Sequence, residues 1–307
     1  MHKQTFITLA YPGSSISSTL MMVASIRKFG ETLADSPVRV LFPRSLGDFS
    51  EQECTRFAEL CVETVPFDAD EETLKFPFGA KVQAAAIAEQ RAAEKTELLI
   101  WLDSDTIVIT EPNEFMLPMD KAMGYRPVHH KLLGLAWGEQ PDPFWTLIYQ
   151  YCQVPVQKGF LMRTHVGEKI CPYFNAGTFV VRPEKGILTR WWQVFQSSYR
   201  VSDFLFLYEK DSRYAIFMHQ AVFTGVLLSM LEPTEMQELS PSINYPLHLH
   251  QDIPLNLRAN HISDLVTVRY EKIFYEPGWQ KKLPISDQLV GWIETQLKIK
   301  PAIGDKS

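Results

Sequence analysis

The fold of this chain is decided by the segment Leu98-Leu99-Ile100-Trp101-Leu102-Asp103-Ser104-Asp105, in which an uninterrupted apolar run ends in two carboxylates one residue apart. Such runs are typical of strands buried on both faces of a parallel sheet. Residues i and i+2 of an extended chain point to one side, so Asp103 and Asp105 are expected to face one spot at the carboxyl edge of the sheet. Two carboxylates in one place repel unless a cation joins them, and oxygen ligands favour Mg²⁺ or Mn²⁺. The segment therefore predicts a metal site at a strand end.

The buried-strand context carries this prediction, because the Asp-x-Asp spacing alone is weak evidence. Asp68-Ala69-Asp70 repeats the spacing, but it continues into Glu71 and Glu72 and is typical of a solvated acidic loop. The alternative for the first pair is a structural one, in which both aspartates only form the turn that ends the strand.

Composition excludes several classes of protein. With 307 residues, 46% hydrophobic and 21% charged, the chain is expected to fold around a large core. A net charge of −6 argues against a nucleic-acid partner. The four cysteines form no C-x-x-C pair, which is typical of a reducing compartment. The longest apolar stretch, 221–231, is too short to span a membrane, and the residues after Met1 do not have the pattern expected of a signal peptide, so we expect a cytoplasmic protein.

Strands and helices alternate in the first third of the chain, which predicts right-handed crossovers and a mostly parallel sheet flanked by helices, an α/β fold. The first loop lacks a G-x-G-x-x-G motif and so does not support an NAD-type site. The expected strands are 5–10, 38–42, 62–67 and 98–102, then 122–128 and 178–182; the expected helices are 18–29, 51–60 and 80–93, then 186–199, 220–230 and 286–298.

Lys81 stands out because it opens the third expected helix, just after Pro77-Phe78-Gly79. A cation at a helix N-terminus opposes the macrodipole, whereas an anion is stabilised there. The position is favourable if a phosphate binds nearby. The alternative is a surface lysine whose stem covers Phe76 or Phe78.

Three segments resemble glycosyltransferases with the GT-A fold, especially the glycogenin-like and galactosyltransferase-like group. Residues 99–108 resemble the D-x-D segment of that group, and residues 173–181 resemble its Asn-x-Gly strand, followed at 186–195 by a tryptophan-bearing helix. His219-Gln220 resembles the Asp-Gln pair of the group, with histidine in place of aspartate. The resemblance spans about residues 5–270.

The resemblance implies a single GT-A-like domain over 1–300, with a nucleotide-binding half at 5–110, a donor-sugar and acceptor half at 111–300, and a flexible tail at 301–307. It also implies the roles of individual residues. Ala10 and Tyr11 would hold the base, and Lys81 would lie near the ribose or diphosphate. The metal and ribose would be contacted by Asp103, Ser104 and Asp105, with His261 as the third metal ligand and His248 and His250 as rivals. The donor sugar would be lined by Asn175 and Gly177, and the reaction centre would contain His219 and Gln220.

The function implied is transfer of a sugar from a nucleotide diphosphate sugar, expected to be UDP-linked, to a saccharide, lipid or protein acceptor, with Mn²⁺ or Mg²⁺ at the leaving diphosphate. The sequence identifies no catalytic base. Three alternatives remain. The first is a sugar-nucleotide-binding protein without turnover, and the second is a nucleotidyltransferase, although the first loop lacks the basic residues of that class. The third is a haloacid-dehalogenase-like phosphatase, because Asp103-Ser104-Asp105-Thr106 resembles the nucleophile motif of that family, although that motif usually follows the first strand.

Overall fold

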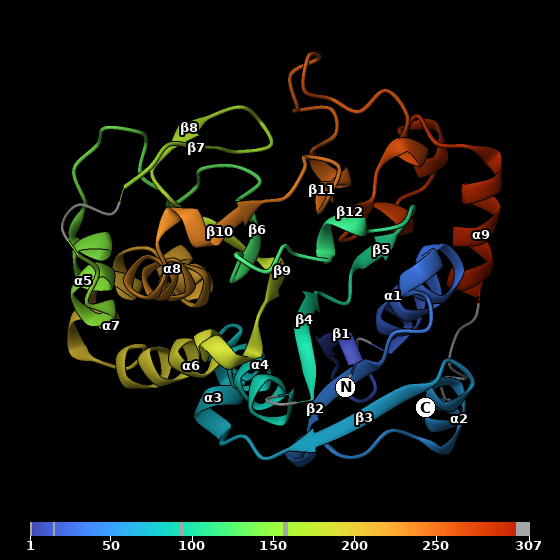
Figure 1. Ribbon diagram of the computed structural model, residues 1–307, viewed down its shortest axis with the longest axis horizontal. Helices are drawn as coiled ribbons and strands as arrows, with labels where there is room; N and C mark the ends of the chain where they lie inside the picture. The colour runs from blue at the N-terminus through green and yellow to red at the C-terminus, as the bar shows by residue number, and fades with distance from the viewer. Residues whose placement is uncertain (1, 15, 93–94, 156–158, 299–307) are drawn as a thin grey trace.

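The centre of the molecule is a seven-stranded sheet with the order β10-β6-β9-β4-β1-β2-β3, seen in a computed structural model that describes residues 2–14, 16–92, 95–155 and 159–298 (Figure 1). Only β9 runs antiparallel to its neighbours in this sheet. The prediction of an α/β fold with a mostly parallel sheet is therefore confirmed. The strands are β1 (His2–Leu9), β2 (Val38–Pro43), β3 (Val62–Phe67), β4 (Thr96–Leu102), β6 (Met123–Pro127), β9 (Phe174–Val181) and β10 (Met236–Glu238).

Helices cover both faces of the sheet, which explains why β4 is apolar throughout. Leu99 and Trp101 pack into the core beneath α4, α6 and α8, whereas Leu98, Ile100 and Leu102 pack on the opposite face with α1. The helices are α1 (Ile16–Phe29), α2 (Glu51–Glu59), α3 (Glu71–Lys75), α4 (Gly79–Ala92), α5 (Pro143–Cys152), α6 (Ile187–Ser198), α7 (Ser202–Lys210), α8 (Arg213–Met230) and α9 (Asp287–Lys298).

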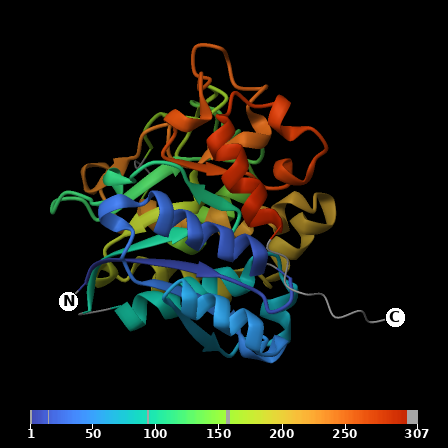
Figure 2. The same cartoon turned by 90° about the vertical axis from the view of Figure 1, so that its right-hand side faces the viewer.

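A small second sheet, β11-β12-β5, ties the late part of the chain to the segment after β4. Its strands are β5 (Thr106–Val108), β11 (Tyr245–Pro246) and β12 (Thr267–Arg269), and β12 pairs antiparallel with β5. A further pair joins β7 (Met162–Arg163) to β8 (Lys169–Ile170). Near the end of the chain α9 packs on α1 (Figure 2). The rings of Phe29 and Trp292 lie 5.0 Å apart at this contact. Residues far apart in sequence therefore meet beside Asp103 and Asp105.

The structure corrects several expected elements. The acidic loop expected after Asp68-Ala69-Asp70 is instead the short helix α3. Asp70 caps its first turn by accepting from the Thr73 N–H at 2.6 Å. Helix α8 begins at Arg213 rather than at residue 220, and α5 and α7 were not predicted. Residue 93 and the expected tail 301–307 lie outside the described residues, and the division into two halves stays a prediction. Every helix within the described ranges is too short or too polar to cross a lipid bilayer.

Candidate functional site

Three segments converge at the carboxyl edge of the central sheet. Asp103 follows β4, and its N–H donates to the carbonyl of Gly177 in β9 at 2.8 Å. Ala10 and Tyr11 follow β1, which is paired with β4 in parallel. Ligands of open α/β sheets bind outside the carboxyl ends of the strands, so this edge is the expected place for a substrate.

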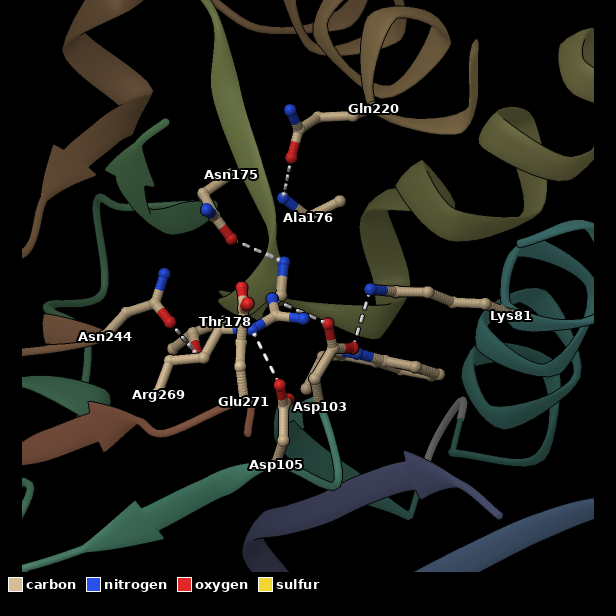
Figure 3. A network of polar contacts seen from close by, with 12 residues as sticks. Lys81, Asp103, Asp105, Asn175, Ala176, Thr178, Gln220, Asn244, Arg269 and Glu271 are labelled. Carbon is tan, nitrogen blue, oxygen red and sulfur yellow. Dashed lines mark hydrogen bonds and ion pairs between the residues drawn. The ribbon is translucent and has the colours of Figure 1, made fainter. Parts of the chain in front are cut away.

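Asp103 is the centre of a buried polar cluster (Figure 3). Its Oδ1 accepts from Lys81 Nζ at 2.6 Å and from Trp101 Nε1 at 2.8 Å, while its Oδ2 lies 3.0 Å from Arg269 Nη1. The side chains of Lys81 and Asp103 are 5% and 14% exposed. The alternative of Lys81 as a surface lysine is therefore wrong, since the ammonium is buried against a carboxylate.

Arg269 joins the two aspartates, because its Nε lies 3.1 Å from Asp105 Oδ2 while its Nη1 contacts Asp103. The reason given from sequence for the meeting of the two carboxylates was wrong. Residues 103–105 are a turn closed by the Thr106 N–H donating to the Asp103 carbonyl at 3.0 Å, and not an extended chain. The carboxylates meet because both contact the same guanidinium. Ser104 lies in this turn, partly exposed.

The ionisation of the two aspartates differs. Burial raises the pKa of Asp103, but Lys81 and Arg269 outweigh burial and hold that pKa below its usual range. Burial raises the pKa of Asp105, Arg269 opposes the rise, and the charge of Asp103 adds to it. Burial lowers the pKa of the Lys81 ammonium, and the 2.6 Å contact with Asp103 opposes this decrease. Asp103 is therefore the firmly ionised member of the pair.

The backbone of β9 is shaped around the cluster. A Cβ placed on Gly177 would overlap Arg269 Nη1 and would lie 3.0 Å from Asp103 Oδ2. Asn175, also buried, accepts from the Gly177 N–H through Oδ1 at 2.7 Å. Gly177, predicted to line the donor sugar, thus also leaves the space in which the guanidinium reaches Asp103.

A cavity of about 240 Å³ opens beside this cluster. Lys81, Asp103, Asn175, Gly177, His219, Gln220 and His248 line it, as do Arg269 and Glu271, which the sequence analysis did not single out. Gln220 holds the β9 backbone here, since its Oε1 accepts from the Ala176 N–H at 3.2 Å. The cavity therefore brings together seven of the predicted site residues, whereas the other six are not among the residues that line it: Ala10, Tyr11, Ser104, Asp105, His250 and His261.

His219 forms part of the cavity wall as a neutral imidazole. Its ring stacks on Phe78 with centroids 4.2 Å apart, and its Nδ1 lies 3.0 Å from the carbonyl of Ile216. A carbonyl can only accept, so Nδ1 carries the hydrogen. Burial and the charge of Lys81 lower the pKa of His219 to about 3. The side chain therefore offers neither a carboxylate nor a cation to a substrate at neutral pH.

The histidines proposed as third metal ligands lie in three different settings. His261 is exposed, precedes a short 3-10 helix at Ile262–Asp264, and is not among the cavity-lining residues. His250 is buried, with Nδ1 2.8 Å from the Tyr245 hydroxyl. His248 lines the cavity, and its Nε2 lies 3.5 Å from Glu271 Oε1. The preferred candidate from sequence, His261, is therefore an exposed residue outside the cavity lining.

At the other side of the cluster, Ala10 is buried and Tyr11 is half-buried after β1. Burial and the charge of Asp103 raise the pKa of the Tyr11 hydroxyl. Their predicted role in base binding stays a prediction.

The comparison with protein families decides the class of this protein. The model of the Rhodobacterales glycosyltransferase domain matches residues 7–205, which is more than half of the chain. The chain belongs to this family. This glycosyltransferase is thus no longer a candidate for the phosphatase or nucleotidyltransferase classes, and the family resemblance predicted from sequence is confirmed. A search of curated protein sequences gave no significant match.

Two solved structures share the fold of this glycosyltransferase at low sequence identity. The galactosyltransferase LgtC, in complex with donor and acceptor sugar analogues, has a TM-score of 0.56 and 11% identity over 97% of both chains. The bifunctional glycosyltransferase WbbM, in its apo form, has a TM-score of 0.51 and 12% identity over 88% of this chain and 46% of WbbM. The chain thus spans less than half of WbbM. These similarities confirm the GT-A-like fold and extend no further.

The resemblance implies a divalent metal, and the residues of this glycosyltransferase can be tested for that fit. Within the described ranges, no group of three or more His, Cys, Asp or Glu side chains is arranged to hold an ion. Arg269 lies between Asp103 and Asp105, and a divalent ion there would lie beside its guanidinium. The two oxygens that would have to bind such an ion, Asp103 Oδ2 and Asp105 Oδ2, are already paired with the Arg269 guanidinium at 3.0 and 3.1 Å. The residues do not fit the predicted Mn²⁺ or Mg²⁺ in this arrangement.

Proposed function

We propose that this protein transfers a sugar from a nucleoside-diphosphate sugar to an acceptor hydroxyl, and that the reaction takes place in the cavity beside Asp103. The main support is the buried ammonium of Lys81, held at 2.6 Å by Asp103 on the cavity wall at the carboxyl edge of the sheet. A buried cation at this edge is suited to an anionic ligand. The family match supplies the reaction class.

The donor is proposed to span the cluster from the end of β1 to the start of β9. Ala10 and Tyr11 would contact the base, Asn175 and Gly177 would line the sugar, and Gln220 would keep the β9 backbone in place. The expected base is uracil, as the family resemblance implies. The acceptor is proposed to be a saccharide, lipid or protein hydroxyl.

The proposed step breaks the bond between the anomeric carbon and a diphosphate oxygen, and the electron pair leaves with the diphosphate. Lys81 would stabilise the charge that develops there. The acceptor oxygen forms the new bond to the anomeric carbon and loses its proton. Glu271 is proposed to take this proton in an inverting reaction, because its carboxylate lines the cavity and is 45% exposed. In a retaining reaction the leaving phosphate would take it instead.

The test is release of nucleoside diphosphate from a panel of UDP-, GDP- and dTDP-hexoses, with and without added acceptors. We expect release by the wild type and its loss in Asp103→Asn. The matched control is Asp68→Asn, which changes an exposed aspartate of the second Asp-x-Asp. Binding of a nucleotide sugar without release would favour the alternative of a binding protein without turnover, and no binding of any donor would refute the proposal.

A further inference from the structure

We infer that Arg269 supplies, from fixed contacts with Asp103 and Asp105, the positive charge that a divalent ion would otherwise bring to the donor diphosphate, and that donor binding is therefore independent of metal. This inference rests on the proposed function and concerns the same site. It starts from the disagreement between the predicted metal and the observed arrangement, in which one guanidinium contacts both carboxylates at 3.0 and 3.1 Å.

The backbone fixes the position of Arg269. In the pairing of β12 with β5, Arg269 lies opposite Thr106, the residue directly after Asp105. The next residue, Tyr270, donates its N–H to the carbonyl of Asp105 at 3.0 Å. The same strand pairing therefore places the guanidinium and the carboxylate, and Figure 3 shows Arg269 reaching from β12 toward both aspartates.

The surrounding residues leave a space that matches this side chain. Gly177 has no Cβ where one would overlap Arg269 Nη1, and Asn175 keeps the glycine backbone in place. The Arg269 side chain is 19% exposed, so most of it is enclosed while the residue still lines the cavity.

The charges also balance without an ion. By formal charge, the two carboxylates of Asp103 and Asp105 are matched by the two cationic side chains of Lys81 and Arg269, as two carboxylates would be by one divalent cation. An arginine guanidinium is not deprotonated in proteins, so Arg269 brings a positive charge to its contacts with both carboxylates. Arginine has five N–H donors in a planar fork, and the contacts at Nε and Nη1 leave others for phosphate oxygens.

The first test measures the affinity of the wild-type protein for UDP by calorimetry, once in EDTA and once with Mn²⁺. We expect the two dissociation constants to agree within about threefold. UDP binding that appears only with Mn²⁺ would overturn the inference and leave the proposed function standing. A failure of UDP, GDP and dTDP to bind in either buffer would instead overturn the proposed function, and the inference with it.

The second test changes the cation itself. Arg269→Met should weaken UDP binding in EDTA by about tenfold or more, because the carboxylates then lose their shared counter-charge. The control is Arg213→Met, which removes an exposed arginine that contacts Asp211 at the surface. An Arg269→Met protein with the wild-type affinity would refute the role of Arg269. If that variant does not fold, the comparison of EDTA with Mn²⁺ on the wild type still decides the matter.

Discussion

The buried pair of Lys81 and Asp103 gives the sharpest energetic prediction. At 2.6 Å and an effective dielectric constant near 20, the two charges attract by about 6 kcal/mol, most of which is offset by the loss of hydration. Removing Asp103 leaves the Lys81 ammonium buried without the carboxylate that contacts it, whereas removing Lys81 leaves Asp103 with Arg269 as a remaining cationic partner. Asp103→Asn is therefore expected to lower the free energy of unfolding by about 3–5 kcal/mol, and Lys81→Met by less.

The assay is urea unfolding of the two single variants and the double variant at neutral pH. The double variant should lose less than the sum of the singles, with a coupling energy of about 1–3 kcal/mol. The control pair is Lys75 with Glu71, whose side chains are 73% and 78% exposed, respectively. The coupling energy of this exposed pair should be less than about 1 kcal/mol. A coupling energy of the Lys81 pair no larger than that of this exposed pair would refute the reasoning that burial makes the contact strong.

Three further predictions follow from the cavity and its surroundings. Gly177→Ala should destabilise the protein by about 1–3 kcal/mol and weaken UDP binding, because the new methyl group displaces Arg269. The control is Gly291→Ala, whose new methyl group has no neighbouring atom within 4 Å. Equal melting temperatures of the two variants would contradict the prediction. Glu271→Gln should lower kcat by about 10²-fold or more with little change in KM, and an unchanged kcat would remove the proposed base. His219 has a pKa of about 3 in the folded protein, below the value near 6.5 in the unfolded chain, so lowering the pH protonates the unfolded state first and destabilises the fold. Between pH 7.5 and 5.5 the free energy of unfolding of the wild type should fall by about 1.4 kcal/mol more than that of His219→Gln. Equal decreases in the two proteins would exclude this histidine as a cause.

The elements around the first Asp-x-Asp could be predicted because their signals are local. The apolar run before Asp103 requires burial on both faces, and the structure provides α1 on one face and α4 on the other. Helix α5 was missed although it carries a local signal. Asp142 caps it by accepting from the Trp145 N–H at 2.8 Å, and Pro143 follows the cap directly. The early start of α8 also carries a local signal that was missed, since the Asp211 side chain accepts from the Arg213 N–H at 2.9 Å, although Ser212 makes no side-chain cap.

Arg269 could not be predicted, because its contacts cross 164 residues of sequence. It lies in a strand of three residues, Thr267–Arg269, too short for a period-2 pattern to reveal which side chain points at Asp105. Glu271 could not be predicted for the same reason, because it is also far from Asp103 in the sequence. His261 was preferred as a metal ligand by its order along the chain, whereas its place in space is set by the packing around Ile262, which turns the histidine to the surface.

The central claim is most directly tested by a crystal structure of this protein soaked with UDP in the presence of EDTA. The account predicts that the diphosphate lies in the cavity next to Lys81 and Arg269, with the guanidinium still on Asp103 and Asp105. A nucleotide bound elsewhere, or an Arg269 displaced from both carboxylates when the nucleotide binds, would contradict it.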